Sequence, residues 1–271
     1  MKIVVLTENT VYRQGILAEH GLSLYIEKED KKYLFDTGQS GVFLKNAKIL
    51  DVNMEDLDGI ILSHGHYDHC GGLEEFAKTY ELPKIYVRKE AFDKKYHQGK
   101  NNCREIGIPW KREILGDHVI FTHEFEEIAK DIYVLGKIPL KNEFESVAEG
   151  MLVETGGKKQ PDFMTDEQML IIRDKEGLYV FLGCSHVGVI NALSYVEEKF
   201  PGEHIHLLLA GMHLSQASDR RLQETMQELE KREIDTMIPV HCTGIIAITQ
   251  MKRRFGEHCK IVHAGKVINQ I

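Results

Sequence analysis

Residues 59–73 read GIILSHGHYDHCGGL, and this stretch decides what kind of fold the chain can adopt. An apolar run at 60–62 predicts a buried strand that ends at Ser63. Four side chains able to bind a metal follow within six positions: His64, His66, Asp68 and His69. Side chains alternate between the two faces of an extended chain, so the first three can point the same way, and the fourth follows where the chain turns. Gly71 and Gly72 would then allow a tight bend into a helix.

Imidazole and carboxylate donors together suit borderline divalent metals, with zinc first and iron or manganese as alternatives. One tetrahedral ion does not take four ligands from a single short loop, so two ions sharing a hydroxide fit the pattern better. The alternative is a loop of solvated histidines, which the spacing directly after a strand disfavours. The stretch therefore predicts a site for two divalent metal ions.

Short apolar and β-branched runs along the chain predict strands at 2–8, 22–27, 31–38, 59–64, 84–89, 118–122, 131–136, 169–174, 178–183, 204–211, 236–241 and 260–264. Helical periodicity predicts helices at 40–50, 71–80, 188–200 and 218–232, the last beginning with a Ser218-Asp219 cap. Strands come first and strand–helix alternation follows, and this order repeats after residue 160. It predicts an α/β fold of two packed sheets with helices outside, a four-layer αββα sandwich.

No low-complexity linker divides the chain, so we expect a single domain over 1–271. The segment 88–117 has weak periodicity and predicts an inserted cap or loop. Within it, residues 88–112 hold the basic Arg88, Lys89, Lys94, Lys95, Lys100, Arg104, Lys111 and Arg112, against the acidic Glu90, Asp93 and Glu105. With Tyr96 and Trp110 nearby, the segment is either a lid that attracts an anionic, ring-containing substrate or a solvated basic surface.

The formal net charge of −8 argues against nucleic acid as the main partner, because a phosphate backbone needs a basic face. The 5 cysteines are widely spaced and form no CxxC pair, which disfavours a disulfide framework or a structural zinc knuckle. The start, MKIVVLTENT, lacks the basic and apolar parts of a secretion signal, and no apolar stretch approaches about 18 residues. We expect a cytoplasmic protein that acts on a small molecule and binds no membrane, in an oligomeric state that the sequence leaves open.

The run HGHYDH at 64–69 resembles the HxHxDH signature of the metallo-β-lactamase superfamily. The resemblance implies the αββα sandwich of the metallo-β-lactamase type and metal-dependent hydrolysis. FDTG at 35–38 resembles the early aspartate element of the family, whose carboxylate supports the metal ligands from behind, a role that would fall to Asp36. PVHCTG at 239–244 resembles the family's final histidine after a strand, which implies that His241 binds the second ion.

A narrower resemblance concerns GCSHVGVIN at 183–191, together with LAGMHL at 209–214 and HCTG. These runs resemble the branch of 7,8-dihydropterin-6-yl-methyl-4-(β-D-ribofuranosyl)aminobenzene 5′-phosphate synthases. The branch implies a pterin or phosphoribosyl-type, anionic substrate.

The chain departs from the superfamily pattern after the strand expected at 178–183. Common members have a histidine before this strand and a bridging aspartate after it, whereas this chain continues with Gly-Cys-Ser-His. We expect His186 to replace the missing histidine. Three further residues are candidate metal ligands: Cys184, Asp166 and Glu167. The alternative for Cys184 is a small side chain buried in the core that binds no metal.

The other histidines carry less information. His213, at the end of an expected strand, is either a substrate contact or an ordinary loop histidine. No ligand role is expected for His20, His97, His118, His123, His204, His206, His258 and His263.

The predicted reaction is hydrolysis. Two ions lower the pKa of a bridging water toward neutrality and polarise the scissile carbonyl or phosphoryl oxygen. Asp68 is the expected catalytic residue, because it ligates and can also orient the nucleophile or accept its proton. The alternatives are a lactonase, thioesterase or phosphodiesterase on the same site, or a metal-bound binding protein without turnover, which would need no hydroxide-generating pair.

Overall fold

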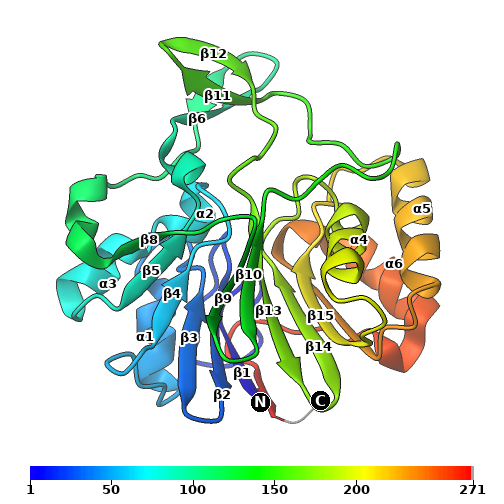
Figure 1. The fold of residues 1–271 in the computed structure, drawn as a ribbon, viewed down its shortest axis with the longest axis horizontal. Helices are drawn as coiled ribbons and strands as arrows, with labels where there is room; N and C mark the ends of the chain where they lie inside the picture. Colours follow the sequence, from blue (N-terminus) through cyan, green and yellow to red (C-terminus); the bar gives the residue numbers. More distant parts are fainter. Residues whose placement is uncertain (270–271) are drawn as a thin grey trace. The chain divides into compact units, whose positions relative to one another are not determined.

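The computed structural model describes residues 1–269, which divide into two compact units (Figure 1). Unit 1 comprises Met1–Thr122, Glu149–Asp162 and 263–269, and unit 2 comprises His123–Ala148 and Phe163–Val262. Within residues 1–269 no helix combines the length and hydropathy that a membrane span requires. The expectation of one domain with a cap at 88–117 stays a prediction.

Unit 1 is built on a seven-stranded mixed sheet. In spatial order its strands are β17 (Val267–Asn269), β1 (Lys2–Thr7), β2 (Ser23–Lys28), β3 (Lys31–Phe35), β4 (Gly59–Ile61), β5 (Lys84–Val87) and β8 (Val119–Phe121). The strands from β17 to β3 pair antiparallel, and those from β3 to β8 pair parallel. Because β3 and β4 are parallel, with Phe35 opposite Ile61, the residues that follow both strands meet at one edge of the sheet.

The parallel connections of unit 1 carry its helices, because a parallel crossover needs a long connection. The helices are α1 (Val42–Ile49), α2 (Tyr67–Cys70) and α3 (Leu73–Thr79). Phe43 of α1 and Phe76 of α3 are fully buried in one apolar cluster with Val4, Leu34 and Ile60 of the sheet. The predicted helices at 40–50 and 71–80 are therefore confirmed, and the core of unit 1 lies directly beneath the ends of β3 and β4.

The segment 88–117 forms more regular structure than its periodicity indicates. It contains η1 (Lys89–Phe92), β6 (Lys95–Gln98), β7 (Cys103–Glu105) and the start of η2 (Arg112–His118). With β11 (Met151–Thr155) and β12 (Lys158–Pro161) it makes a four-stranded antiparallel sheet in the order β12-β11-β6-β7. None of these strands was predicted, because β7 and β12 are exposed and polar.

Unit 2 is built on a six-stranded sheet. In spatial order its strands are β16 (Thr236–Val240), β15 (Ile205–Gly211), β14 (Gly177–Leu182), β13 (Gln168–Asp174), β10 (Ile132–Gly136) and β9 (Phe125–Ala129). The first three are mutually parallel, so the residues after β14, β15 and β16 also meet at one edge. The remaining pairs are antiparallel.

Three helices of unit 2 pack their apolar faces on this sheet: α4 (Val189–Lys199), α5 (Asp219–Glu230) and α6 (Ile245–Phe255). Two 3-10 turns, η3 (His241–Thr243) and η4 (Gly256–His258), flank α6. The predicted cap of α5 is confirmed, because Ser218 accepts a hydrogen bond from the Arg221 backbone N–H at 3.2 Å. Helix α6 was not predicted, since Ile245 and Ile246 are exposed and obscure its apolar face.

The prediction of a strand at 260–264 is wrong. Lys260 N–H donates to the Met237 carbonyl at 2.8 Å, whereas Ala264 N–H donates to the Thr10 carbonyl at 2.9 Å. The segment changes partners within five residues, so it forms isolated bridges instead of a ladder.

Candidate metal centre

The four predicted ligands after β4 lie on a loop and a short helix instead of on an extended strand. β4 ends at Ile61, and the backbone of His66, at φ −88° and ψ 147°, begins α2, which contains Asp68 and His69. Strand alternation therefore does not direct these side chains, and the prediction is wrong on that point. All four ligands are nevertheless buried: His64, His66, Asp68 and His69.

The glycines after the ligands are required by close packing. A Cβ atom at Gly71 would lie 2.3 Å from the Gln39 carbonyl oxygen, and one at Gly72 would lie 2.2 Å from that of Thr37. The φ angles of Gly71 and Gly72, −61° and −70°, are ordinary helical values. Gly71 and Gly72 connect α2 to α3 without a left-handed angle, and glycine here allows both helices to approach the chain that follows β3.

Asp36 orients two of the imidazoles. Its Oδ1 accepts a hydrogen bond from Ser63 N–H at 2.7 Å, and its Oδ2 accepts from Ser63 Oγ at 2.7 Å and from His69 Nδ1 at 2.6 Å. Because Ser63 gives its one hydroxyl proton to Asp36, His64 Nδ1, 2.9 Å from Ser63 Oγ, must be the donor of that contact. Both His64 and His69 thus carry the proton on Nδ1 and the lone pair on Nε2, the tautomer in which Nε2 can bind a metal.

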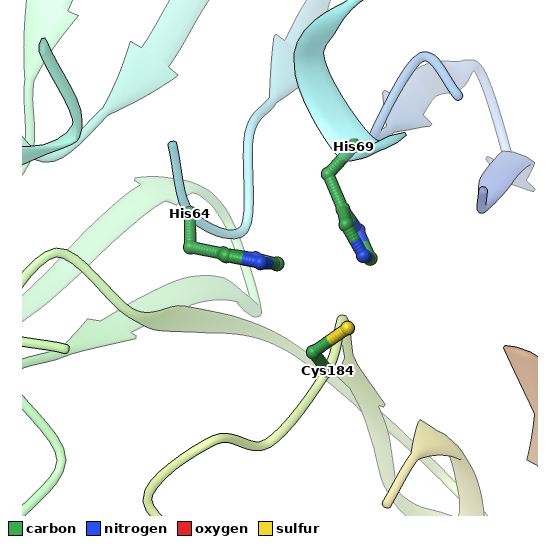
Figure 2. Close-up of side chains that lie close together, drawn as sticks. All are labelled: His64, His69 and Cys184. Carbon is green, nitrogen blue, oxygen red and sulfur yellow. The ribbon is translucent and has the colours of Figure 1, made fainter. Parts of the chain in front are cut away.

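The donor atoms of unit 1 converge. His64 Nε2 lies 3.0 Å from His66 Nδ1, and the ring centroid of His64 lies 4.3 Å from that of His69. Figure 2 shows the rings of His64 and His69 extending into the same space. Asp68 Oδ2 lies 4.0 Å from His69 Nε2. Buried imidazoles and a carboxylate at these separations fit a divalent ion of the zinc, iron or manganese kind.

His20 contacts this group although no role was expected for it. Its Nε2 lies 3.1 Å from Asp68 Oδ2. The neighbouring chain is tied to the same residue, because Leu22 N–H donates to the Asp68 carbonyl at 3.3 Å and a Cβ atom at Gly21 would lie 2.6 Å from that oxygen. The contact joins residues 48 positions apart, and the local pattern of 19–22 contains no sign of it.

The 88–117 segment is bound to the ligand loop from the other side. Tyr67 N–H donates to the Ile106 carbonyl at 3.0 Å, and the indole N–H of Trp110 donates to the Cys70 carbonyl at 2.7 Å. Trp110 is buried and belongs to the core of unit 1. Trp110 therefore contributes no exposed ring to the lid that the sequence left as one of two possibilities for this segment.

The basic residues of the segment fall into two groups. Arg88 and Lys95 are buried, and Lys95 Nζ pairs with Asp162 Oδ2 at 2.7 Å. Arg112 lies over the ring of Phe121 at 4.8 Å. The other six are exposed: Lys89, Lys94, Lys100, Arg104, Lys111 and Arg112. Only this second group can attract an anion from solvent.

In unit 2 the potential ligands lie after three neighbouring parallel strands. The ligand atoms of Cys184, His241 and Cys242 all lie within 4.8 Å of one another. Cys184 lies two residues after the end of β14 and is labelled in Figure 2. His186 is buried, and its ring centroid lies 4.5 Å from that of His213. Cys242 was missed because a cysteine beside a histidine matches no common ligand spacing.

Several of these positions have left-handed backbone angles. The φ angles are 48° at Ser185, 49° at His213 and 51° at His241, and Asp36 in unit 1 has 59°. Such angles are uncommon outside glycine and cluster at functional sites, where the surrounding structure maintains them. These four residues follow the ends of β3, β14, β15 and β16, where the candidate ligands also lie.

Two buried carboxylates cap the chain around His186. Glu167 accepts from the N–H groups of His186, at 2.6 Å, and Val187, at 3.1 Å, one through each oxygen. Glu145 accepts from Ile190 N–H at 3.0 Å at the start of α4. Burial raises the pKa of Glu145 above its ordinary value, against the lowering effect of its hydrogen bonds. The contacts of Glu167 favour support of the loop over metal binding; Asp166, buried beside it, stays open as a ligand.

Comparison with known proteins adds independent information. Residues 17–184 match the family model of the metallo-β-lactamase superfamily. The 7,8-dihydropterin-6-methyl-4-(beta-D-ribofuranosyl)-aminobenzene-5′-phosphate synthase of Methanocaldococcus jannaschii is 30% identical, over 99% of this chain and 96% of its own. An uncharacterised protein of the same organism is 33% identical over 98% of this chain and 99% of its own. The crystal structure of a metal-dependent hydrolase of the β-lactamase superfamily is similar with a TM-score of 0.88 and 34% identity, covering 100% of this chain and 99% of the other.

Proposed function

The chain belongs to the metallo-β-lactamase superfamily and is a metal-dependent hydrolase of that fold, and on this premise we propose that it hydrolyses a small anionic substrate at a dinuclear site. The predicted α/β fold of the metallo-β-lactamase type and the predicted class of enzyme are thereby confirmed. The number of ions, the metal and the substrate are the proposal.

The proposed ligands are His64, His66, Asp68, His69, His186 and His241. The observation that carries the proposal is the hydrogen-bonded chain from Asp36 through Ser63, which sets the Nε2 lone pairs of His64 and His69. A solvated histidine loop would not bury a carboxylate to fix two tautomers. Zinc suits this donor set best, and iron and manganese are the alternatives.

Two bound divalent ions supply a water nucleophile active at neutral pH and polarise the scissile bond. Asp68 orients that nucleophile and can accept its proton at the carboxylate. His20, 3.1 Å from Asp68 Oδ2, restricts the rotation of this carboxylate. Asp36 holds His69 in one orientation, so the ligand set is formed before the substrate arrives.

The proposed substrate is a pterin or phosphoribosyl-type compound with a phosphate group. Support comes from the resemblance of 183–191 to the dihydropterin branch and from the name of the 30% identical relative. The exposed basic residues of the 88–117 segment would favour such an anion. His213 is proposed as a substrate contact, and nucleic acid as a substrate is disfavoured by the net charge of −8. The cytoplasm stays the expected location.

The test uses the full chain, purified gently and assayed for metal and turnover. We expect about two equivalents of transition metal per chain. The substrates are a phosphorylated ribosyl pterin, a generic phosphodiester, a lactone, a thioester and a short single-stranded DNA. Hydrolysis of the first, lost in His69→Ala, supports the proposal.

Each other outcome is informative. Less than half an equivalent of metal, with no uptake of added zinc, iron or manganese, contradicts the dinuclear site. Preferred turnover of the lactone, thioester or generic phosphodiester replaces the substrate class by that alternative. Cleavage of DNA alone would reverse the exclusion of nucleic acid. Two bound ions without any turnover would indicate a binding protein.

A further inference from the structure

Cys184 and Cys242 have no part in the reaction proposed above, yet both lie at the ligand edge of unit 2. We propose that the two thiols bind, together with His241, a thiophilic divalent ion, with zinc as the first candidate. The inference deepens the proposed function and rests on it, because it assigns sulfur ligands to one ion of the metal site. The proposed group lies entirely within unit 2, and its sulfur donors distinguish it from the nitrogen and oxygen donors of the His64–His69 loop in unit 1.

The separations suit a common ion. In a tetrahedral zinc site, Zn–S bonds of about 2.3 Å and Zn–N bonds of about 2.0–2.1 Å place the ligand atoms roughly 3.5–3.8 Å apart. The ligand atoms of Cys184, His241 and Cys242 all lie within 4.8 Å of one another. Small side-chain rotations therefore suffice to close the group on an ion. Cys184 and His241 are only 3% exposed each, and Cys242 is partly exposed, so two of the three donors are withdrawn from water.

The backbone explains how two neighbouring residues can serve one ion. In an extended chain, consecutive side chains point to opposite faces, so His241 and Cys242 would diverge. β16 instead ends at Val240, and His241 has a φ of 51° at the start of η3. This left-handed turn brings the ligand atoms of both residues to the same group. The strained backbone of His241 is explained by a requirement that the side chains of His241 and Cys242 both bind the ion.

The surroundings of Cys242 are arranged for a sulfur ligand. The His213 N–H donates to Cys242 Sγ at 3.3 Å, and such a bond orients a thiolate and stabilises its charge. A Cβ atom at Gly211 would lie 2.9 Å from the same sulfur, so the missing side chain makes room for it. The Cys242 thiol donates to the Cys184 carbonyl oxygen at 3.4 Å, which places the two cysteines side by side. Binding of an ion would displace this thiol proton.

The donor set has a consequence for metal selection. Thiolates favour zinc and other soft or borderline ions over manganese and magnesium, which prefer oxygen ligands. The proposed site therefore discriminates between metals that the His64–His69 loop alone would accept equally. His213 then has two roles. Its backbone N–H supports Cys242, and its ring lies 4.5 Å from the ring of His186.

The experiment is X-ray absorption spectroscopy at the zinc edge on the full-length protein, kept reduced and loaded with zinc. We expect a sulfur shell at about 2.3 Å in addition to nitrogen and oxygen at about 2.0–2.1 Å. Cys184→Ser and Cys242→Ser should each weaken the sulfur shell, and the double variant should lose it. Loss of a ligand should also lower the affinity for one zinc by about tenfold or more. The matched control is Cys103→Ser, whose exposed thiol lies on β7 of unit 1.

Circular dichroism and thermal unfolding verify that each variant folds. In cobalt-loaded protein, the thiolate-to-cobalt absorption band should follow the same pattern, which provides a second measurement independent of activity. About two zinc ions bound through nitrogen and oxygen alone would overturn the inference and leave the proposed function standing. A sulfur shell that survives in the double variant would overturn it as well. Failure to bind zinc at all would instead contradict the metal centre of the proposed function.

Discussion

The two units assemble potential ligands in opposite ways. In unit 1 the candidate donors are nitrogen and oxygen atoms that follow a single strand within six positions. One side chain, Asp36, orients two of them, His69 directly and His64 through Ser63. In unit 2 the donors follow different strands, include two thiols, and are held largely through the main chain. In unit 1, therefore, side-chain hydrogen bonds orient the candidate ligands. In unit 2, the ends of three parallel strands position them.

This difference determines what a substitution does. Removing the Asp36 side chain should disturb His64 and His69 together, because the tautomers and rotamers of both imidazoles depend on this one acceptor. Removing one support in unit 2 should affect a single ligand, because each strand end is anchored separately. Four predictions test this contrast, beginning with the largest effect.

The strongest prediction concerns Asp36→Ala. The change removes the acceptor of Ser63 N–H, Ser63 Oγ and His69 Nδ1, all buried, and each unsatisfied group costs about 1–3 kcal/mol. We expect the free energy of unfolding to fall by about 3–5 kcal/mol, with loss of the metal held by the loop. Urea denaturation and elemental analysis measure both effects.

The control for Asp36 is Asp30→Ala. Asp30 has an 82% exposed side chain and pairs with Lys31 at 3.8 Å, so its loss should change stability by no more than about 0.5 kcal/mol. If Asp36→Ala behaves like Asp30→Ala, the chain from Asp36 through Ser63 does not hold the ligands, and the contrast between the units fails.

The second prediction concerns Glu167→Gln in unit 2. The amide keeps one acceptor for the N–H groups of His186 and Val187 but loses the charge-assisted bonds, at a cost of about 1–2 kcal/mol. We expect a modest loss of stability and an unchanged metal content. Glu176→Gln, at the surface beside Lys175, is the matched control. A fall of about one equivalent of metal without a stability change would make Glu167 a ligand, the possibility that the sequence left open.

The same contrast explains which candidate site residues could be predicted from the sequence. The loop from His64 to His69 is readable because its ligands are contiguous, and Asp36 entered through its resemblance to a family element. His20 and Cys242 were missed, since their relevance comes from contacts with residues distant in sequence or in an unfamiliar pattern. The assignment of ligand roles stays a prediction for all six residues: His64, His66, Asp68, His69, His186 and His241.

The fold follows the same rule. Helices such as α5 were predicted because the apolar stripe and the Ser218 cap are local features. The sheet of β6, β7, β11 and β12 was missed because its strands are stabilised by pairing between segments 50 residues apart and bury few apolar side chains. The error about strand alternation in the ligand loop has a similar origin. The helical turn at 67–70 depends partly on the bonds from Tyr67 to Ile106 and from Trp110 to Cys70.

The third prediction therefore tests whether the 88–117 segment clamps the ligand loop. Trp110→Phe removes the indole bond to the Cys70 carbonyl but keeps an aromatic ring in the core, so the expected loss of stability is about 1 kcal/mol. Thermal unfolding measures it, with Tyr12→Phe, at a 77% exposed position, as control. An unchanged stability would show that the indole bond does not hold the ligand loop in place.

The smallest effect is expected from the exposed basic residues of the same segment. Lys95 is excluded because its buried pair with Asp162 makes it part of the structure. Lys94, Lys100 and Arg104 are exposed, and their joint replacement by Gln should remove about 1 kcal/mol of attraction for an anionic substrate. That loss corresponds to about a fivefold rise in KM with kcat little changed, because uniform binding is lost.

Salt provides the internal control for this last effect. Attraction between exposed charges is screened over about 8–10 Å at ordinary ionic strength, so added salt should raise the KM of the wild type but hardly that of the triple variant. A matched triple variant of exposed residues in unit 2 should keep the wild-type KM and its salt dependence: Lys130, Lys175 and Arg253, each to Gln. Steady-state kinetics at two ionic strengths separates the cases. If both triple variants behave alike, the basic residues of the 88–117 segment are a solvated surface, and any preference for anions must come from the metal ligands themselves.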